Sequence, residues 1–146
     1  MEERLGRLLG ITGKVVREHF DQDLATIGSS LNTYIILRTV QSNPGVSQRQ
    51  LAAYLSIVGP TLTHHLDRLE ADGLLVRVRD SADRRAQNVE LTGAGTAHLE
   101  RVESHAAEAD RALRSLFTAS EVATLVELLN RIRSHYCKES DVRPAR

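Results

Sequence analysis

The side chains best suited to contact another molecule follow Pro60. Thr61, Thr63 and His64 carry hydroxyl and imidazole groups that can hydrogen-bond to base edges or phosphates. Arg68 follows one helical turn later and could meet a phosphate backbone. The major groove of DNA admits an α-helix and is read mainly by residues near the helix N-terminus. This arrangement therefore predicts a DNA-reading helix.

An apolar stripe positions these groups. Leu62, Leu66 and Leu69 stand at i, i+4 and i+7, which places them on one face of a helix. We expect Gly59 to be the N-cap, Pro60 the first helical residue, and Gly73 the left-handed residue after the end. The opposite face and its flanks hold the polar set: Thr61, Thr63, His64, His65, Asp67 and Arg68. The alternative interpretation is an ordinary solvated helix face.

The surrounding pattern predicts a winged helix. Ser47 to Gln50 has the spacing of a capping box, and a short helix follows it. A turn over 56–59 joins that helix to the Pro60 helix, which is a helix-turn-helix pattern. Residues 74–79 and 86–91 then read as two strands, the first with valines on one face and arginines on the other. We place Ser47, Gln48 and Pro60 in the DNA-binding set as well.

The predicted hairpin has a charged tip. Arg84 and Arg85 are well placed for a minor groove, whose negative potential attracts arginine, and Asp83 could orient Arg85 by an ion pair. Carboxylates nevertheless outnumber arginines, six to five, between Pro60 and Glu90. Nonspecific affinity should therefore be modest, although His64 and His65 could add positive charge in mildly acidic solution.

Composition narrows the class of protein. The 146 residues are 41% apolar but only 3% aromatic, which favours an aliphatic, mainly helical core, and 19 basic residues balance 19 acidic ones. The single cysteine, Cys137, excludes an intrachain disulfide. We find no secretory signal and no apolar run long enough to span a membrane, so we expect a soluble, cytoplasmic protein.

Residues 46–92 closely resemble the MarR family of bacterial transcriptional regulators. The resemblance lies in Leu51-Ala52-x-x-Leu55, in the run from Gly59 to Leu75, in Asp83-Arg84-Arg85 and in Leu91-Thr92-x-x-Gly95. The order of the predicted helices before and after also agrees. Two positions depart from the family pattern: His64 stands where arginine is frequent after Thr63, and Ala82 replaces an arginine early in the wing.

The resemblance implies a homodimeric repressor that binds a pseudo-palindromic site on double-stranded DNA, with Arg85 in the minor groove. It implies one domain over 1–146, with dimerisation helices at 1–30 and 93–138 around a winged-helix lobe at 31–92; we expect a flexible tail at 139–146. Family members commonly sense small phenolic or other aromatic effectors. The residues that could contact such an effector are His19, Tyr34 and Arg38. No cofactor is expected.

Two other functions compete with this interpretation. Six histidines suggest metal or acid–base chemistry, but their spacing matches no metal motif, and the sequence lacks a nucleophile elbow and a phosphate loop. We therefore predict no catalytic and no metal-binding residue. The second alternative is a winged-helix protein-interaction module that does not bind DNA, which the near-neutral lobe favours and the Asp83-Arg84-Arg85 tip disfavours.

Overall fold

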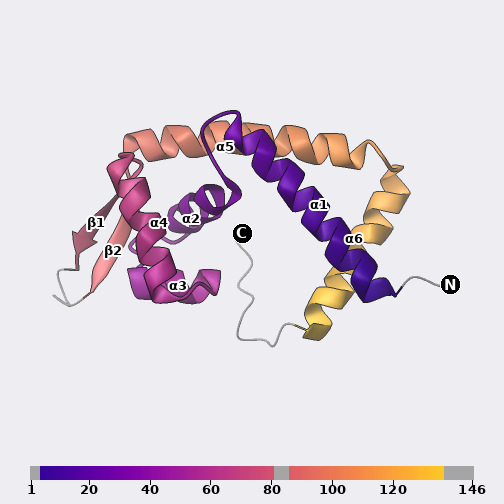
Figure 1. Cartoon of the computed structure of the whole chain (residues 1–146), viewed down its shortest axis with the longest axis horizontal. Helices are drawn as coiled ribbons and strands as arrows, with labels where there is room; N and C mark the ends of the chain where they lie inside the picture. Colours follow the sequence, from indigo (N-terminus) through magenta and orange to yellow (C-terminus); the bar gives the residue numbers. More distant parts are fainter. Residues whose placement is uncertain (1–3, 81–85, 137–146) are drawn as a thin grey trace. The chain divides into compact units, whose positions relative to one another are not determined.

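The computed structural model describes residues 4–80 and 86–136. The chain forms two compact units, Met1–Ala106 and Ala107–Arg146. The elements, labelled in Figure 1, are α1 (Leu5–Ala25), α2 (Leu31–Ser42), α3 (Gln48–Leu55), α4 (Gly59–Ala71), β1 (Leu75–Arg79), β2 (Gln87–Leu91), α5 (Gly93–Arg114) and α6 (Ala119–Tyr136). The predicted class, mainly α with a small hairpin, is confirmed.

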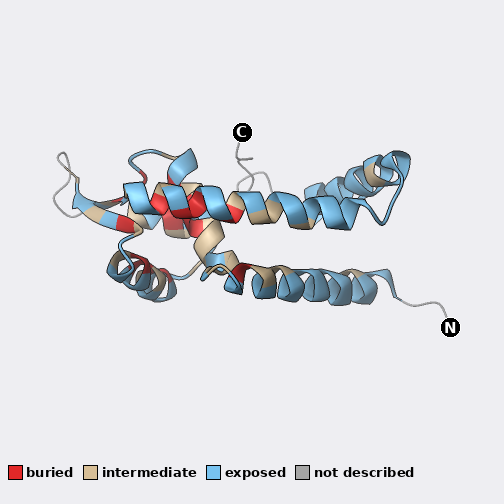
Figure 2. Cartoon of the chain, turned by 90° about the horizontal axis from the view of Figure 1, so that it is seen from above, coloured by how far each residue is buried: buried red, intermediate tan, exposed pale blue. Residues whose placement is uncertain are grey.

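The core of the first unit is the apolar interior of a winged-helix lobe. The predicted stripe of Leu62, Leu66 and Leu69 on α4 is buried, as expected. It packs with residues of α2, the loop after α2, α3, the hairpin and α5: Ile36, Leu37, Val40, Val46, Leu51, Leu75, Val89 and Leu99. Figure 2 shows these buried segments gathered in the lobe, whereas α1 has only Leu24 buried. Burial of one face of α4 leaves its opposite face free.

The turn between α3 and α4 differs in detail from the prediction. Helix α4 begins at Gly59, so Val58 is the N-cap and the prediction of Gly59 as N-cap was wrong by one residue. The left-handed residue of the turn is Ser56, with φ 52°. The Ile57 amide donates to the Ala52 carbonyl at 3.1 Å, which closes the end of α3. The turn therefore needs no glycine at its tightest point.

The hairpin pairs antiparallel, with Leu75 opposite Leu91 and Arg77 opposite Val89. The valines and arginines of β1 do lie on opposite faces, but the arginine face is the one turned inward. Val76 and Val78 are 40% and 42% exposed, whereas the Arg77 side chain is 18% exposed. Leu75, on the same face as Arg77, is fully buried in the core, and acidic residues of α4 pair with Arg77 on this side of the strand.

The start of α5 fits tightly against the start of the hairpin. Thr92 Oγ1 donates to the Gly73 carbonyl at 2.6 Å and accepts from the Gly95 amide at 3.0 Å, so it caps α5 while holding it to the end of α4. A Cβ atom on Gly95 would lie 1.8 Å from the Leu74 carbonyl oxygen. This close approach explains the leucine-threonine-x-x-glycine pattern physically.

The second unit contains the end of α5 and all of α6. Thr118 to Glu121 has the sequence spacing of a second capping box, and the box is present: Glu121 accepts from the Thr118 amide at 2.8 Å, and the Glu121 amide donates to Thr118 Oγ1 at 3.3 Å. The apolar spacing of Leu99, Val102, Ala106, Ala109, Leu113 and Leu116 predicts one helical seam. Leu116 instead lies beyond α5 and is 72% exposed. No residue of α6 is buried, although its sequence is amphipathic.

Candidate nucleic-acid interface

Helix α3 fixes α4 through a polar contact at their crossing. The capping box of Ser47 and Gln50 begins α3 as predicted, with both reciprocal hydrogen bonds present. It leaves Gln48 free to donate from Nε2 to Thr63 Oγ1 at 2.8 Å. Thr63 in turn donates to the Gly59 carbonyl at 3.0 Å. The structure thus brings Gln48 and Thr63 together, and the only proton of the Thr63 hydroxyl is used inside the protein.

The free face of α4 carries the remaining predicted residues. Pro60, Thr61, His64 and Arg68 are exposed, and His65 is half-buried with its ring centroid 6.1 Å from that of His64. On a helix His64 and Arg68 are one turn apart and neighbours on the surface. The face therefore presents two hydrogen-bonding groups near the N-terminus and a permanent cation behind them.

The N-terminus of α4 is open to an anion. Val58 has no side-chain acceptor, so it forms no side-chain cap with the first N–H groups of the helix. The amides of Gly59 and Thr61 lie at the positive end of the helix dipole, beside exposed side chains. A phosphate is the kind of group that such an end accepts.

Sequence reasoning missed a charged cluster between α4 and the wing. Arg77 Nη2 lies 2.6 Å from Asp67 Oδ1 and 2.6 Å from Glu70 Oε2. The side-chain and backbone hydrogen bonds from Arg77 lower the pKa of Glu70, and those carboxylates raise the pKa of Arg77. The alternation of valine and arginine in β1 gave no signal, because it does not reveal which face turns inward.

The predicted wing-tip residues Asp83, Arg84 and Arg85 lie outside the described residues. At the base of the hairpin, the Asp80 amide donates to the Ala86 carbonyl at 3.0 Å and Asn88 Nδ2 donates to Asp80 Oδ2 at 3.1 Å. These hydrogen bonds close the β-ladder directly below the tip. The role of the tip residues in DNA binding stays a sequence-based prediction.

The three predicted effector contacts have separate partners. Arg38 Nη1 lies 2.6 Å from Glu103 Oε1, which joins α2 to α5. The Tyr34 ring packs edge-to-face on Phe20, with centroids 6.4 Å apart. His19 is exposed beside Asp23, at 3.7 Å. Tyr34 and Arg38 are one turn apart on α2, but no hydrogen bond, ion pair or ring contact among the described residues joins the three to one another.

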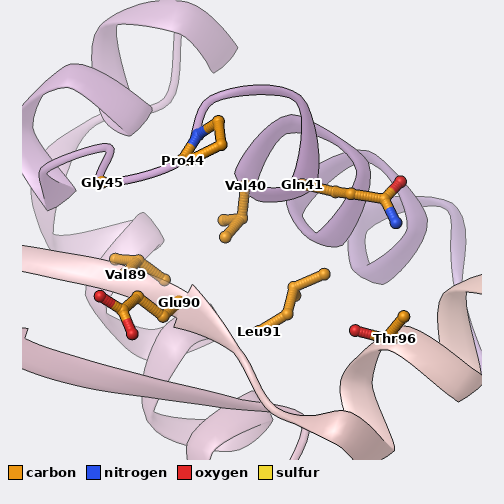
Figure 3. A pocket seen from close by; sticks show the side chains of 8 residues that line it. All are labelled: Val40, Gln41, Pro44, Gly45, Val89, Glu90, Leu91 and Thr96. Carbon is orange, nitrogen blue, oxygen red and sulfur yellow. The ribbon is translucent and has the colours of Figure 1, made fainter.

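A cavity of about 280 Å³ lies elsewhere in the lobe, between the end of α2, β2 and the start of α5 (Figure 3). Val40 and Leu91 point into it from facing elements, and its rim includes Glu90 and Thr96. The cavity is slightly smaller than typical pockets for drug-sized ligands. It contains none of the residues predicted to contact an effector.

A buried histidine joins α5 to the loop before α2. His98 is 6% exposed, with Nδ1 3.1 Å from Arg101 Nη2 and Nε2 3.0 Å from Ser29 Oγ. A guanidinium can only donate, so Nδ1 accepts and the neutral ring donates from Nε2 to Ser29. Burial and the Arg101 charge lower the pKa of His98, while Asp72 opposes the shift.

Acidification is expected to destabilise the protein through His98. Its pKa is about 6.5 when unfolded and lower when folded, so the unfolded chain binds the proton more tightly. The stability contributed by neutral His98 is complete above the unfolded value and is lost as pH falls through the folded pKa. Urea unfolding from about pH 7.5 to about pH 5 should show this decline. His98→Gln should flatten it, whereas exposed His64→Gln should not; equal slopes in wild type and His98→Gln would contradict the assignment.

Membrane-spanning helices and clusters of metal ligands are both absent from the described residues. No helix within residues 4–80 and 86–136 is long and apolar enough to cross a membrane. Within those ranges no three His, Cys, Asp or Glu side chains lie together as metal ligands would.

The fold and this site define a winged helix-turn-helix protein. A model described as the MarR family matches residues 27–86. CouR, a transcriptional repressor solved bound to a 23-mer DNA duplex, is 31% identical, with a TM-score of 0.83 over 88% of this chain and 92% of CouR. The chain belongs to the MarR family.

Curated relatives agree with this membership. The transcriptional regulator PecS of Dickeya dadantii is 39% identical over 90 residues, which cover 62% of this chain and 54% of PecS. The homoprotocatechuate degradative operon repressor of Escherichia coli is 34% identical over 94 residues, which cover 64% of each chain. The matched region thus spans between about half and two thirds of the length of these relatives.

Proposed function

We propose that this protein is a homodimeric, cytoplasmic transcriptional repressor that binds a specific sequence in double-stranded DNA. The observation that carries the proposal is the exposed face of α4, which bears His64 and Arg68 beside an uncapped helix N-terminus. The opposite face is buried, and Gln48 holds the helix at Thr63. A helix fixed on one side and polar on the other is suited to the major groove. The DNA-bound state of CouR supports the same use.

The apolar surface outside the lobe supports dimerisation. Along α1, exposed apolar side chains recur from Leu5 to Val16, and in α6 the residues Leu125, Val126, Leu128 and Leu129 are 40–45% exposed. Exposed apolar surface on this scale marks interaction sites in soluble proteins. A twofold dimer would present two α4 helices to successive turns of DNA, about 34–36 Å apart, and so read a pseudo-palindrome.

A binding selection distinguishes a repressor from a protein-interaction module. The full-length protein is incubated with a random pool of duplex DNA, and the bound fraction is sequenced after several rounds. Enrichment of a pseudo-palindrome supports the proposal. A pool that stays random, together with no shift of any duplex at low salt, would favour the interaction module.

Arg68→Ala and His64→Ala are expected to change DNA binding in different ways. Loss of Arg68, as a phosphate contact, should weaken binding to all sequences and reduce the slope of log K against log salt by about 1. Loss of His64, as a base contact, should cost about 1–3 kcal/mol on the selected site and relax its preference at one position. Titrations at several salt concentrations measure both effects. Arg133→Ala in α6 is the matched charge control. It should change neither the salt dependence of DNA binding nor the sequence preference.

We further propose that a small aromatic effector weakens the binding of the protein to DNA, and that His19, Tyr34 and Arg38 are its candidate contacts. Arg38 supports an acidic effector, because a ligand carboxylate or phenolate could take the place of Glu103. Such a ligand changes DNA affinity only if it binds two arrangements of the dimer unequally. A panel of hydroxybenzoates added to the DNA complex tests this, and Arg38→Gln should remove any response to an acidic compound.

A further inference from the structure

We infer that Arg77 is a positioning residue that locks the wing strand to the recognition helix and offsets the negative charge of Asp67 beside the DNA-reading face. The inference rests on the proposed DNA-binding function. It assigns a role to a side chain that the sequence pattern placed only on one face of a strand.

The geometry of the cluster favours a fixed arrangement. Glu70 receives three hydrogen bonds from Arg77: the backbone amide donates to Oε1 at 3.0 Å, Nε to Oε2 at 3.1 Å and Nη2 to Oε2 at 2.6 Å. Both carboxylate oxygens are therefore held by one residue of β1. Nη2 also donates to Asp67 Oδ1 at 2.6 Å. One arginine thus binds two successive turns of α4, and its backbone is part of the hairpin.

The exposures of the three side chains suggest different roles. The Arg77 side chain is 18% exposed, Glu70 is 36% exposed and Asp67 is 56% exposed. Glu70 acts mainly as an anchor, whereas Asp67 lies at the edge of the free face, three residues after His64. A carboxylate there would repel the phosphates that Arg68 is proposed to bind. Arg77 reduces that repulsion from inside the protein.

The same contacts join the two elements proposed to touch DNA. Helix α4 carries the groove-reading side chains, and β1 leads into the wing tip. The ladder pairs β1 with β2 but does not by itself fix the hairpin against α4. Buried Leu75 and Val89 join the hairpin to the same core as α4. The Arg77 fork adds a polar link farther along β1, so its loss should loosen that part of the strand as well as expose the charge of Asp67.

A double-mutant cycle on DNA affinity tests the charge role. The probes are the duplex selected by the wild type and a duplex of unrelated sequence. Arg77→Gln should weaken binding to both by about tenfold, and Asp67→Asn should tighten binding far more in that background than in the wild type. Arg79→Gln is the matched control, because it makes the same charge change on the same strand, and among the described residues Arg79 forms no hydrogen bond or ion pair with Asp67. In the Arg79→Gln background, Asp67→Asn should raise DNA affinity by the same factor as it does in the wild type.

Two results of the cycle would overturn the inference. Equal gains from Asp67→Asn in the wild-type and Arg77→Gln backgrounds would mean that Arg77 does not offset Asp67. A loss of affinity in Asp67→Asn alone would mean that Asp67 itself contacts a base. The inference is supported if Asp67→Asn raises DNA affinity more in the Arg77→Gln background than in the wild-type and Arg79→Gln backgrounds.

Hydrogen exchange without DNA tests the mechanical role separately. The Arg77 amide donates to Glu70, so Glu70→Ala, which removes the acceptor, should make that amide and its β1 neighbours exchange several-fold faster, whereas Arg79→Gln should leave them unchanged. Unchanged exchange in Glu70→Ala would overturn the lock. If the wild type bound no duplex at all, the repressor proposal would fail, while the exchange comparison would still decide whether Arg77 holds β1 to α4.

Discussion

Gly95→Ala is expected to lower the free energy of unfolding by roughly 3 kcal/mol, because overpacking against backbone cannot be relieved by a rotamer change. The added methyl carbon would lie 1.8 Å from the Leu74 carbonyl oxygen and 2.9 Å from its carbonyl carbon. The start of α5 would have to move away from the hairpin. This movement would also disturb the hydrogen bond that the Thr92 amide donates to the Leu74 carbonyl at 3.1 Å. Urea unfolding at a fixed protein concentration measures the loss.

The matched control is Gly93→Ala, two residues earlier in the same helix. A methyl group there meets nothing within 4 Å, so the change should be neutral or slightly stabilising. Equal stabilities of Gly95→Ala and Gly93→Ala would show that α5 does not approach Leu74 as closely as the structure has it.

Leu66→Ala should destabilise the protein by about 2–5 kcal/mol, through lost burial and the cavity left behind. Leu66 is 0% exposed and lies at the centre of the stripe that seats α4 in the lobe. DNA affinity should fall more steeply with temperature than in the wild type, because the recognition helix loses the packing that orients it. Thermal and urea unfolding report stability, and the binding titration is repeated at two temperatures.

Thr61→Ala is the control for the unfolding measurement. Thr61 is exposed on the same helix, and exposed substitutions of this kind usually change stability by no more than about 0.5 kcal/mol. If Leu66→Ala were as stable as Thr61→Ala, the α4 stripe would not be the side that anchors the helix.

Local patterns in the sequence predicted the elements well. The i, i+4, i+7 leucines of α4 are buried, both capping boxes form, and Gly73 has φ +71° after the end of α4. These features depend on neighbours within about one helical turn, which the sequence lists directly. The free face of α4 followed from the same reasoning, because it is the complement of the buried stripe.

The partners of polar residues could not be read in the same way. His64 and Thr63 look alike as candidates for base contact, yet Thr63 is bound by Gln48, fifteen positions away in sequence. The sequence placed Arg77 only on one face of a strand, and His98 was one of six histidines whose spacing matches no metal motif. Their roles depend on which groups the fold brings within hydrogen-bonding distance.

The sequence by itself determined where the helices and strands lie, which face of α4 is apolar and the MarR-type order of motifs. Only the tertiary structure decided which face of β1 turns inward, that Arg77 joins Asp67 and Glu70, and that Gly95 meets Leu74. The physical reason is range: periodicity and capping act between near neighbours, whereas ion pairs and steric contacts depend on the distance between segments that only the fold brings together.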